Sequence, residues 1–427
     1  MLNVFNVDFI EEMEKSYLDY SLSVIKDRAI PDIMGCKPIH NRVLYGASLL
    51  GLASNGAYKK SARLVGEIIG RLSPHGDTSA YEAMARMSQD WNVRYPLIDM
   101  GGNNGSCDGD SPAAMRYTLC RLSKIGEEML KDLKKDAVDW KPNFSEDEME
   151  PCSMSGFFPN ILANGTSGIA VGYSSNFAPH NLKETVSAIN ATIENSDITI
   201  EELVEKYIQG PDFPLGGEII NKKDVVKIYK EGKGGFITRG RYKIEDKGRT
   251  IVFYDMPFSA KKSNLIGEIV QCVRDNKIDG ISNITDETTT KEFRIAITLK
   301  RGFDADVVAN KIYAYTRMQQ TVSINQNVLL DGEPKQLNLK EIIDQYIIKC
   351  LGIIKRKTNF SLNKISDRLH LIEGLLVALE DIDNVITLIK SSSNAKDAIL
   401  TLRTKYNLSE VQASAIVDMK LKRLTGL

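Results

Sequence analysis

The order of apolar and polar positions along the chain divides it into regions of different character. The first part predicts four short helices, separated by breaks at proline and glycine, over about 8–28, 38–51, 61–72 and 77–89. Strand-like segments and a loop rich in glycine and asparagine follow them. Three helices followed by such strands are typical of a helix-turn-helix domain with a wing. We therefore expect an N-terminal arm helix in residues 1–26 and a winged-helix domain in residues 27–145.

The pattern changes after this first part. Directly after Tyr117 a helix is predicted, because five apolar side chains repeat at three- and four-residue spacing: Leu119, Leu122, Ile125, Met129 and Leu133. From Pro151 to about Leu330, apolar or alternating runs between turn residues predict strands mixed with helices, as at 168–172, 250–254 and 293–299. Residues 146–334 are therefore expected to form an α/β domain.

The last quarter carries one long apolar stripe. Steps of three or four residues continue without a break through Ile347, Leu351, Ile354, Thr358, Leu362, Ile365, Leu369, Ile372, Leu376 and Leu379. A stripe of this length predicts a long helix in a coiled coil, rather than a helix packed on a core. Little sequence remains after 391–393 to supply a partner helix. We expect residues 335–427 to form a coiled coil with a dimerisation region, and the polypeptide to continue beyond Leu427. The fold class is α+β and multidomain.

Composition excludes several classes of protein. The chain has 427 residues, of which 42% are hydrophobic and 26% charged, as expected for a soluble globular protein. No run of about 18 uncharged apolar residues predicts a membrane span, and the N-terminus does not resemble a secretory signal. The six cysteines form no C-x-x-C pair, so reduced cytosolic thiols are favoured over a disulfide framework or a zinc site.

Charge is unevenly distributed although the formal net charge is only −1. Residues 26–71 contain eight basic and three acidic side chains, and residues 127–150 contain nine acidic side chains and four lysines. A local basic field can hold phosphate groups whatever the total charge is, so a nucleic-acid partner is compatible with this balance. An ordinary solvated surface would also explain it.

Tyr117 is the strongest candidate for covalent chemistry. A tyrosine phenol can attack a phosphodiester and form a phosphotyrosyl ester, which conserves the energy of the bond for resealing. Free phenols ionise only near pH ~10, so at neutral pH the attack needs assistance. A neighbouring cation such as Arg116 can stabilise both the phenolate and the pentavalent phosphate. An isolated Arg-Tyr pair is usually structural, so the surrounding sequence must decide.

That surrounding sequence points to one family. The segment AAMRYT at 113–118 resembles the active-site signature of the A subunits of bacterial type IIA DNA topoisomerases, DNA gyrase and topoisomerase IV. Further matches follow in the family's order: RAIPD at 28–32, GCKPIH at 35–40, YKKSAR at 58–63, PHGD at 74–77, GNNGS at 102–106, PNILANG at 159–165, GPDFP at 210–214 and RLTGL at 423–427. The resemblance covers essentially the whole chain, including its breakage-reunion region, and the ordered set is very specific.

The resemblance implies roles for individual residues. Tyr117 would be the nucleophile, with Arg116 beside it, and Arg28 would act at the same scissile phosphate across a dimer. DNA phosphates would be bound by four residues: Lys37, His40, Arg42 and His75. Two features depart from the family pattern, because the loop at 32–35 is one residue shorter and Asn41 stands where a second arginine is usual.

Two further sites follow from the same resemblance. Thr78 and Glu82 match positions that hold quinolone drugs, although both would also suit a DNA-facing helix as plain polar residues. The segment SGIA at 167–170 resembles a hairpin that inserts an isoleucine, here Ile169, between base pairs. Apolar wedges of this kind unstack a step and bend the duplex. Core packing is the alternative for Ile169.

Cofactors and partners are also implied rather than visible. The sequence has no cluster of metal ligands and no G-x-x-x-x-G-K-[ST] phosphate loop. The resemblance implies that Mg²⁺ and ATP are bound by a partner B subunit with ATPase and TOPRIM domains, so no metal site is expected in this chain. Two copies of each subunit would form an A₂B₂ heterotetramer, with this chain dimerising through a helical gate. Residues 146–334 would correspond to the family's tower domain.

The implied activity is that of an ATP-dependent isomerase in the cytoplasm, acting on double-stranded DNA of the chromosome or of a phage, without a membrane partner. It would break both strands through a 5′-phosphotyrosyl link, pass another duplex and religate. DMGGNNGS at 99–106 favours topoisomerase IV, whereas NLKE at 338–341 and the terminal LTGL favour gyrase. No C-terminal DNA-wrapping domain is present in these residues to decide. A DNA-binding scaffold without cleavage is the alternative outside the family.

Overall fold

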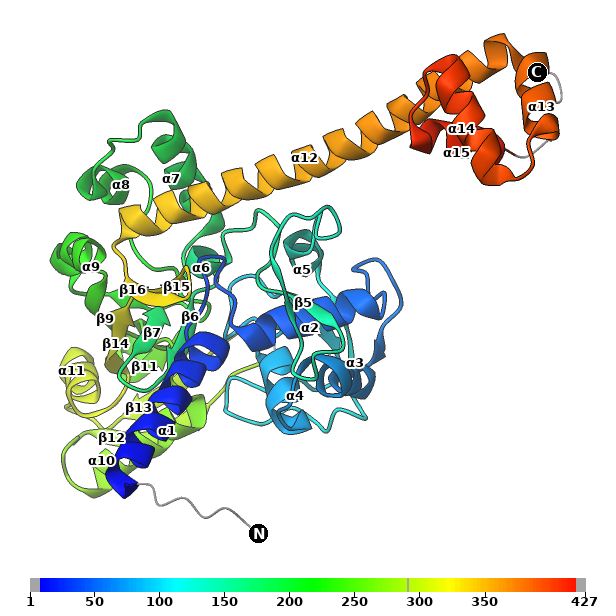
Figure 1. Cartoon of the computed structure of the whole chain (residues 1–427). Helices are drawn as coiled ribbons and strands as arrows, with labels where there is room; N and C mark the ends of the chain where they lie inside the picture. Colours follow the sequence, from blue (N-terminus) through cyan, green and yellow to red (C-terminus); the bar gives the residue numbers. More distant parts are fainter. Residues whose placement is uncertain (1–7, 290–291, 420–427) are drawn as a thin grey trace. The chain divides into compact units, whose positions relative to one another are not determined.

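The computed structural model describes residues 8–289 and 292–419, and its mixed α+β composition confirms the predicted class (Figure 1). Two compact units make up the chain. One comprises Met1–Leu133 and Val138–Ile353, and the other comprises Lys134–Ala137 and Ile354–Leu427. The first seven residues of the predicted arm and the match at 423–427 lie outside the described residues.

The N-terminal helices lie where the sequence predicts them. The first is α1 (Phe9–Val24), which begins at Asp8, whose Oδ1 accepts the backbone N–H of Ile10 at 2.9 Å. A side-chain acceptor there satisfies an amide that has no partner within the helix. The following helical segments are a π-helical turn (Ile25–Ala29), α2 (Pro38–Leu49), α3 (Ser61–Glu67), a second π-helical turn (Ile68–Leu72) and α4 (Asp77–Arg86). Pro38 occupies the first turn of α2, where its missing N–H costs nothing.

A small antiparallel sheet completes this region and corrects one prediction. Its strands have the order β1 (Lys59–Lys60), β3 (Leu119–Leu122) and β2 (Ile98–Gly101). Leu119 and Leu122 were predicted on a helix, but they lie on β3, where Cys120 and Leu122 are buried and Leu119 is 38% exposed. That alternation is the two-residue period of a strand. The helix α5 (Lys124–Met129) starts only after Ser123, whose hydroxyl accepts the Gly126 N–H.

Three helices and this sheet are the elements that a winged-helix domain requires, and the motif itself stays a prediction. Their shared core contains Val43 and Leu44 of α2, Leu64 of α3, Met84 of α4 and Ile98 of β2. The α2–α4 helices therefore form one packed body with the strand that follows Tyr117. A separate hairpin of β4 (Trp140–Pro142) and β5 (Met149–Pro151) follows in the chain.

Two larger antiparallel sheets follow. The first has the strand order β6 (Thr166–Ile169), β7 (Ser174–Phe177), β14 (Gln319–Asn325), β9 (Lys233–Arg239) and β8 (Glu218–Ile219). The second has the order β10 (Tyr242–Glu245), β11 (Thr250–Phe253), β13 (Ile295–Leu299) and β12 (Ile281–Asp286). The strands predicted at 168–172, 250–254 and 293–299 thus correspond to parts of β6, β11 and β13, although β6 ends at Ile169.

Helices pack on each of these sheets. The first sheet shares a core with α7 (Leu182–Glu194), α8 (Ile200–Lys206), α9 (Val225–Glu231) and the beginning of α12. The second shares a core with α10 (Lys262–Arg274) and α11 (Ala305–Tyr315). This region also contains α6 (Asn160–Ala163) and the hairpin of β15 (Asn327–Leu330) and β16 (Glu333–Gln336). The expected α/β region thus contains two sheet-and-helix cores.

A buried histidine supports the core of the first sheet. His180 is 1% exposed, with Nδ1 2.9 Å from the Leu162 carbonyl oxygen and Nε2 2.7 Å from the Tyr229 hydroxyl. A carbonyl can only accept, so Nδ1 carries the proton and Nε2 accepts from Tyr229. Burial, opposed by the Leu162 carbonyl, lowers the pKa of His180 to about 4. The ring is therefore neutral at neutral pH.

Acidification is expected to destabilise the fold through this histidine. Its folded pKa of about 4 lies below the ordinary 6.5, so between these values the unfolded chain binds the extra proton. Stability should be full above pH 6.5 and fall as pH drops, by about 2 kcal/mol at pH 5 from this residue alone. The free energy of unfolding in urea, measured for the native protein and for His180→Gln between pH 5 and 7.5, tests this loss of stability. Equal pH slopes for the two proteins would contradict the assignment.

The C-terminal part is helical. The long helix α12 (Leu339–Glu380) has 42 residues and is followed by α13 (Ile382–Ser391), α14 (Ala395–Tyr406) and α15 (Glu410–Val417) (Figure 1). The predicted long helix is confirmed, but the coiled coil stays a prediction. Members of its apolar stripe are exposed in this chain, among them Leu362, Ile365 and Leu369. In the part of the chain that the structure describes, no helix combines the length and apolarity needed to cross a membrane.

Candidate active site

Tyr117 lies on the surface at the end of the loop that joins β2 to β3. Its side chain is 69% exposed, and the Arg116 guanidinium carbon lies 4.8 Å from the centroid of its ring. Cation and ring at this separation attract each other through the ring quadrupole. The phenol is thus open to a large substrate and has a positive charge beside it. Its role as a nucleophile stays a prediction.

The residue after Tyr117 is fixed in the core. Thr118 is fully buried, and its Oγ1 donates to the Ser61 hydroxyl at 2.9 Å and lies 2.9 Å from the Tyr81 hydroxyl. The backbone N–H of Ser61 donates to the Thr118 carbonyl at 3.0 Å. These contacts tie β3 to the start of α3 and to α4. They anchor the backbone at Thr118 while the neighbouring Tyr117 side chain remains outside.

The loop before Tyr117 is held by α4 and the turn that follows it. Gln89 donates through Nε2 to the Asn104 carbonyl at 2.5 Å, and the Tyr81 hydroxyl donates to the Ala113 carbonyl at 2.5 Å. Gly105 has a φ of +100°, and a Cβ there would lie 2.8 Å from the Asp110 carbonyl oxygen. Only glycine suits such a position. The glycines of the GNNGS segment therefore allow a compact loop that runs back toward the tyrosine.

Arg28 is exposed near the end of the first π-helical turn. Among the described residues it has no hydrogen bond or ion pair with Tyr117 or Arg116. The contacts among the described residues therefore join Arg116 to Tyr117 but do not include Arg28. The predicted action of Arg28 across a dimer stays a prediction.

Lys37 and Ile169 are brought near each other by the β6–β7 hairpin. Lys37 Nζ donates to the Ser167 carbonyl oxygen at 3.0 Å. Burial, and then the positive charge of Arg86, lowers the pKa of Lys37. A Cβ at Gly168 would collide with the Ala29 carbonyl oxygen, so the hairpin packs tightly on the turn that carries Arg28. Glycine at position 168 makes this close approach possible.

Ile169 itself projects from the hairpin. It is 87% exposed, the highest value among the large exposed apolar side chains of the described residues. Core packing, the alternative interpretation from the sequence, therefore does not explain this isoleucine. An aliphatic side chain kept in water at the tip of an ordered hairpin has the form that a wedge requires. Its insertion between base pairs stays a prediction.

His40 lies in the first turn of α2. Its Nδ1 accepts the Lys37 backbone N–H at 3.4 Å. Burial, and then the charge of Lys37, lowers the pKa of His40 to about 3. The ring is consequently neutral at neutral pH and can offer a phosphate one N–H donor, but no full charge.

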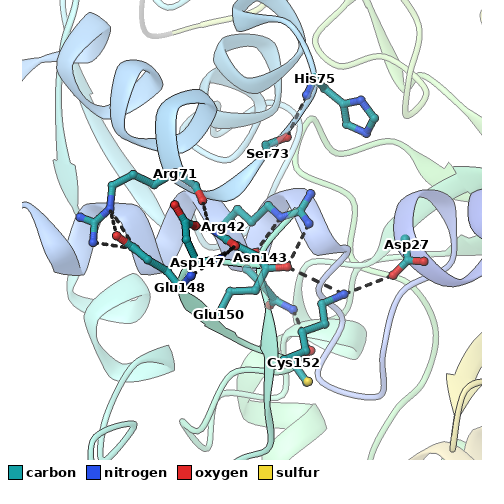
Figure 2. A network of polar contacts seen from close by, with 12 residues as sticks. Asp27, Arg42, Arg71, Ser73, His75, Asn143, Asp147, Glu148, Glu150 and Cys152 are labelled. Carbon is teal, nitrogen blue, oxygen red and sulfur yellow. Dashed lines mark hydrogen bonds and ion pairs between the residues drawn. The ribbon is translucent and has the colours of Figure 1, made fainter. Parts of the chain in front are cut away.

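Arg42, predicted to bind a DNA phosphate, is instead paired within the protein (Figure 2). Its Nε and Nη2 donate to the two carboxylate oxygens of Glu150, both at 2.9 Å, and the two side chains are 11% and 4% exposed. Lys141 lies 3.8 Å from the same carboxylate and 3.2 Å from Asp27. The pair uses two of the five N–H donors of Arg42, and at 11% exposure its side chain offers little surface to a phosphate. Its predicted role remains untested.

The acidic segment therefore neutralises part of the basic one. Arg71 Nη2 donates to Glu148 at 2.7 Å (Figure 2). Arg71 also pairs with Glu67. The expected basic field over residues 26–71 is weakened at Arg42 and Arg71. Counting the charged residues in each segment could not reveal these ion pairs. Asn41, the departure from the family pattern, is 6% exposed and donates to the Cys152 carbonyl at 3.3 Å. Its position in the core removes it from direct contact with DNA.

His75 precedes α4, Thr78 lies in its first turn and Glu82 in its second, and all three are exposed. The backbone N–H of His75 donates to Ser73 Oγ at 3.4 Å (Figure 2), and that of Thr78 donates to Asp77 Oδ1 at 2.8 Å. Thr78 and Glu82 are four residues apart and so lie on one face of the helix. Their side chains are open to a ligand on that face, as the drug-binding prediction requires. That prediction remains untested.

Within residues 8–289 and 292–419, no group of three or more histidine, cysteine or carboxylate side chains is arranged to hold a metal ion. All six cysteines are free thiols. The residues predicted for the site include an exposed phenol with a guanidinium against its ring and an exposed apolar tip at Ile169.

Comparison with known proteins defines the class to which this site belongs. The family model that describes the A subunit of DNA gyrase/topoisomerase IV matches residues 28–427. The chain belongs to this family, the A subunits of type IIA topoisomerases.

Three similar relatives are all named as the A subunit of DNA gyrase. The protein from Halalkalibacterium halodurans is 45% identical over 424 residues, which cover 99% of this chain and 51% of the relative. Those from Staphylococcus epidermidis and Staphylococcus aureus (strain NCTC 8325) are each 45% identical over 421 residues, which cover 97% of this chain and 47% of each relative. The chain thus spans about half the length of the curated relatives it matches.

Proposed function

We propose that this chain is the DNA-cleaving subunit of a type IIA topoisomerase and that Tyr117 is its nucleophile. The observation that carries the proposal is the exposed Tyr117 phenol with the Arg116 guanidinium against its ring, in a chain of this family. The buried neighbour Thr118 holds the backbone in place, so the phenol is presented from a rigid base. Preorganisation of this kind lowers the barrier to reaction.

The proposed step is a transesterification. The Tyr117 phenol oxygen forms a bond to the DNA phosphorus, and the bond from phosphorus to the 3′ oxygen breaks. The phenol loses its proton, and the leaving 3′ oxygen gains one, so a 3′ hydroxyl and a 5′-phosphotyrosyl ester result. Arg116 stabilises the negative charge that develops on the phosphate. Religation reverses the step without an external energy source, since one ester replaces another.

DNA binding is proposed to involve Lys37, His40, Arg42, His75 and Ile169. Arg28 is proposed to act at the scissile phosphate across the dimer. Mg²⁺ and ATP would be supplied by a B subunit with TOPRIM and ATPase domains. Thr78 and Glu82 are proposed as the quinolone contacts. The place of action would be the cytoplasm, on the chromosome or on phage DNA.

Assembly is proposed to follow from the C-terminal helices. Leu351, Leu362, Ile365 and Leu369 of α12 are each more than half exposed. Exposed apolar stripes of this length are favourable in water only when another helix covers them. We propose that residues 335–427 pair with a second copy of this chain and that two B subunits complete an A₂B₂ enzyme. Residues 1–26, 27–145 and 146–334 would be the arm, winged-helix and tower domains.

The function is tested by trapping with denaturant. The protein is incubated with a B subunit, Mg²⁺, ATP and supercoiled plasmid, and protein attached covalently to 5′ DNA ends is measured. Absence of adducts would favour the alternative of a binding scaffold. Supercoiling and decatenation assays then separate gyrase from topoisomerase IV, and the names of the 45% identical relatives favour gyrase.

Ile169→Ala is expected to reduce DNA bending. The substitution removes most of an apolar side chain that is 87% exposed, so it leaves no cavity in the fold. Unstacking a base step costs a few kcal/mol, and an inserted apolar side chain offsets this cost. Without the isoleucine wedge, the duplex should therefore bend less. Energy transfer between dyes at the two duplex ends measures bending, and adduct trapping measures cleavage. Val307→Ala, at a 55% exposed position on α11, is the control. Unchanged bending in Ile169→Ala would exclude the wedge.

A further inference from the structure

A buried lysine outside the predicted site contacts the loop that precedes Tyr117. Lys262 begins α10, and its side chain is 7% exposed. Its Nζ lies 2.8 Å from Asp286 Oδ2 at the end of β12 and 3.1 Å from Asp108 Oδ1. Asp108 belongs to the segment between the GNNGS motif and Tyr117. One buried cation therefore joins that loop to the second sheet-and-helix core.

Three neighbouring contacts strengthen this junction. Ser263 Oγ donates to the Asp108 carbonyl oxygen at 2.8 Å, and Cys107 packs against the apolar core beneath α10. Gly109 has a φ of +98°, and a Cβ there would lie 2.8 Å from Cδ of Lys261. Consecutive loop residues are thus docked on the beginning of α10 by an ion pair, a hydrogen bond and apolar contact. We call this contact between residues 107–109 and α10 the loop tether.

The loop is consequently held from two sides. On the side of α4 it is fixed by Gln89 and Tyr81, whose contacts with Asn104 and Ala113 belong to the helical core. At α10 it is fixed by Lys262, which belongs to a different core. The tyrosine lies nine residues beyond Asp108 in the same loop. Its placement relative to a phosphate therefore depends on both cores.

We propose that Lys262 is a positioning residue for the cleavage reaction and that it acts through Asp108 on the loop that carries Tyr117. The inference rests on the proposed nucleophilic role of Tyr117. A lysine so buried between two carboxylates cannot serve as a phosphate ligand, so it contributes to geometry rather than to DNA affinity. Without its charge, Asp108 and Asp286 repel each other and the loop leaves α10.

The test compares cleavage rate with DNA affinity in Lys262→Met. With the B subunit, Mg²⁺ and supercoiled plasmid, the rate of adduct formation at saturating DNA should fall about tenfold or more, because misplacement of a reacting group by about 1 Å can cost 100-fold. DNA affinity and its salt dependence should stay within about twofold, since no phosphate contact is lost. Lys262→Arg, which keeps the charge, should restore most of the rate.

Two further variants of this chain serve as controls for charge loss and for folding. Lys311→Met is the matched control, because Lys311 pairs with Asp279 at 3.2 Å on the exposed face of α11 and does not contact the loop. The triple variant Lys262→Met, Asp108→Asn, Asp286→Asn leaves no unpaired charge, so it should fold even if Lys262→Met does not. It should still cleave slowly, because the ion pair that holds Asp108 on α10 is missing.

The outcomes separate this inference from the function on which it rests. Adducts in the native protein with an unchanged rate in Lys262→Met or in the triple variant would overturn the positioning role alone. A parallel loss of DNA affinity would overturn it as well, since Lys262 would then act on binding. If the native protein forms no Tyr117 adduct at all, the proposed function fails, and the positioning role fails with it.

Discussion

Tyr117→Phe is expected to abolish covalent attachment of the protein to DNA while leaving DNA binding intact. Phenylalanine keeps the ring against which the Arg116 guanidinium lies at 4.8 Å, but it removes the oxygen that would bond to phosphorus. The side chain is 69% exposed, so the change creates no cavity and should not affect the fold. Adducts should fall below detection even with the B subunit, Mg²⁺ and ATP.

Binding is expected to survive because it rests on other groups. Affinity for duplex DNA comes mainly from lysine and arginine contacts with phosphates, whose number sets the slope of affinity against salt. Tyr117→Phe changes none of them, so the affinity at each salt concentration and the slope should both be retained. The measurements are anisotropy titrations over a range of salt and, in parallel, trapping of 5′-linked protein with denaturant.

The chain offers a matched control for this substitution. Tyr58 also carries an arginine over its ring, with the Arg121 guanidinium carbon 4.1 Å from the centroid, but its hydroxyl donates to Asp99 at 2.6 Å. Its oxygen is therefore occupied, and Tyr58→Phe should retain cleavage. Normal adduct levels in Tyr117→Phe would mean that another nucleophile does the chemistry. Loss of adducts in both variants would show that the assay responds to general damage.

These two Arg-Tyr pairs also show what sequence reasoning could and could not provide. An arginine stacked on an exposed tyrosine occurs at both Tyr117 and Tyr58, so the pair alone does not identify a nucleophile. The ordered motifs along the chain correctly indicated the family, because each belongs to a distinct part of the family's chain. The role of Tyr117 as nucleophile stays a prediction. The helices were predictable for a local reason. Their breaks at Pro31, Gly35 and Pro38 and their three- and four-residue spacing depend on neighbouring residues alone.

Contacts between distant segments were not predictable in the same way. Leu119 and Leu122 satisfied a helical period, but pairing of β3 with β1 and β2 decided their structure. Arg42 and Glu150 are 108 residues apart, and no local pattern indicated that the basic and acidic segments neutralise each other there. Lys262 and Asp108 are likewise joined only by the fold. Local periodicity cannot report such pairs, because their energy depends on burial and geometry.

Glu150→Gln is expected to be the most destabilising of the charge substitutions that this structure suggests. Glutamine can accept only one of the two hydrogen bonds that Arg42 donates at 2.9 Å, and it leaves a guanidinium charge that is 11% exposed without a counterion. Loss of one partner from a buried ion pair costs about 3–5 kcal/mol. The measurement is the free energy of unfolding of the native protein and of Glu150→Gln in urea. The comparison holds if the free energy of both proteins falls with urea concentration at the same slope.

A surface pair and a double substitution show whether burial is the cause. Arg239 and Glu218 also form an ion pair, but their side chains are 35% and 41% exposed, so Glu218→Gln should cost less than about 1 kcal/mol. The double variant Arg42→Met, Glu150→Leu removes both charges and should regain much of the lost stability, because apolar replacements of buried ion pairs are often neutral. If Glu150→Gln costs no more than Glu218→Gln, the Arg42–Glu150 pair is not a desolvated interaction. Arg42 would then be free enough to bind a DNA phosphate, as the sequence predicted.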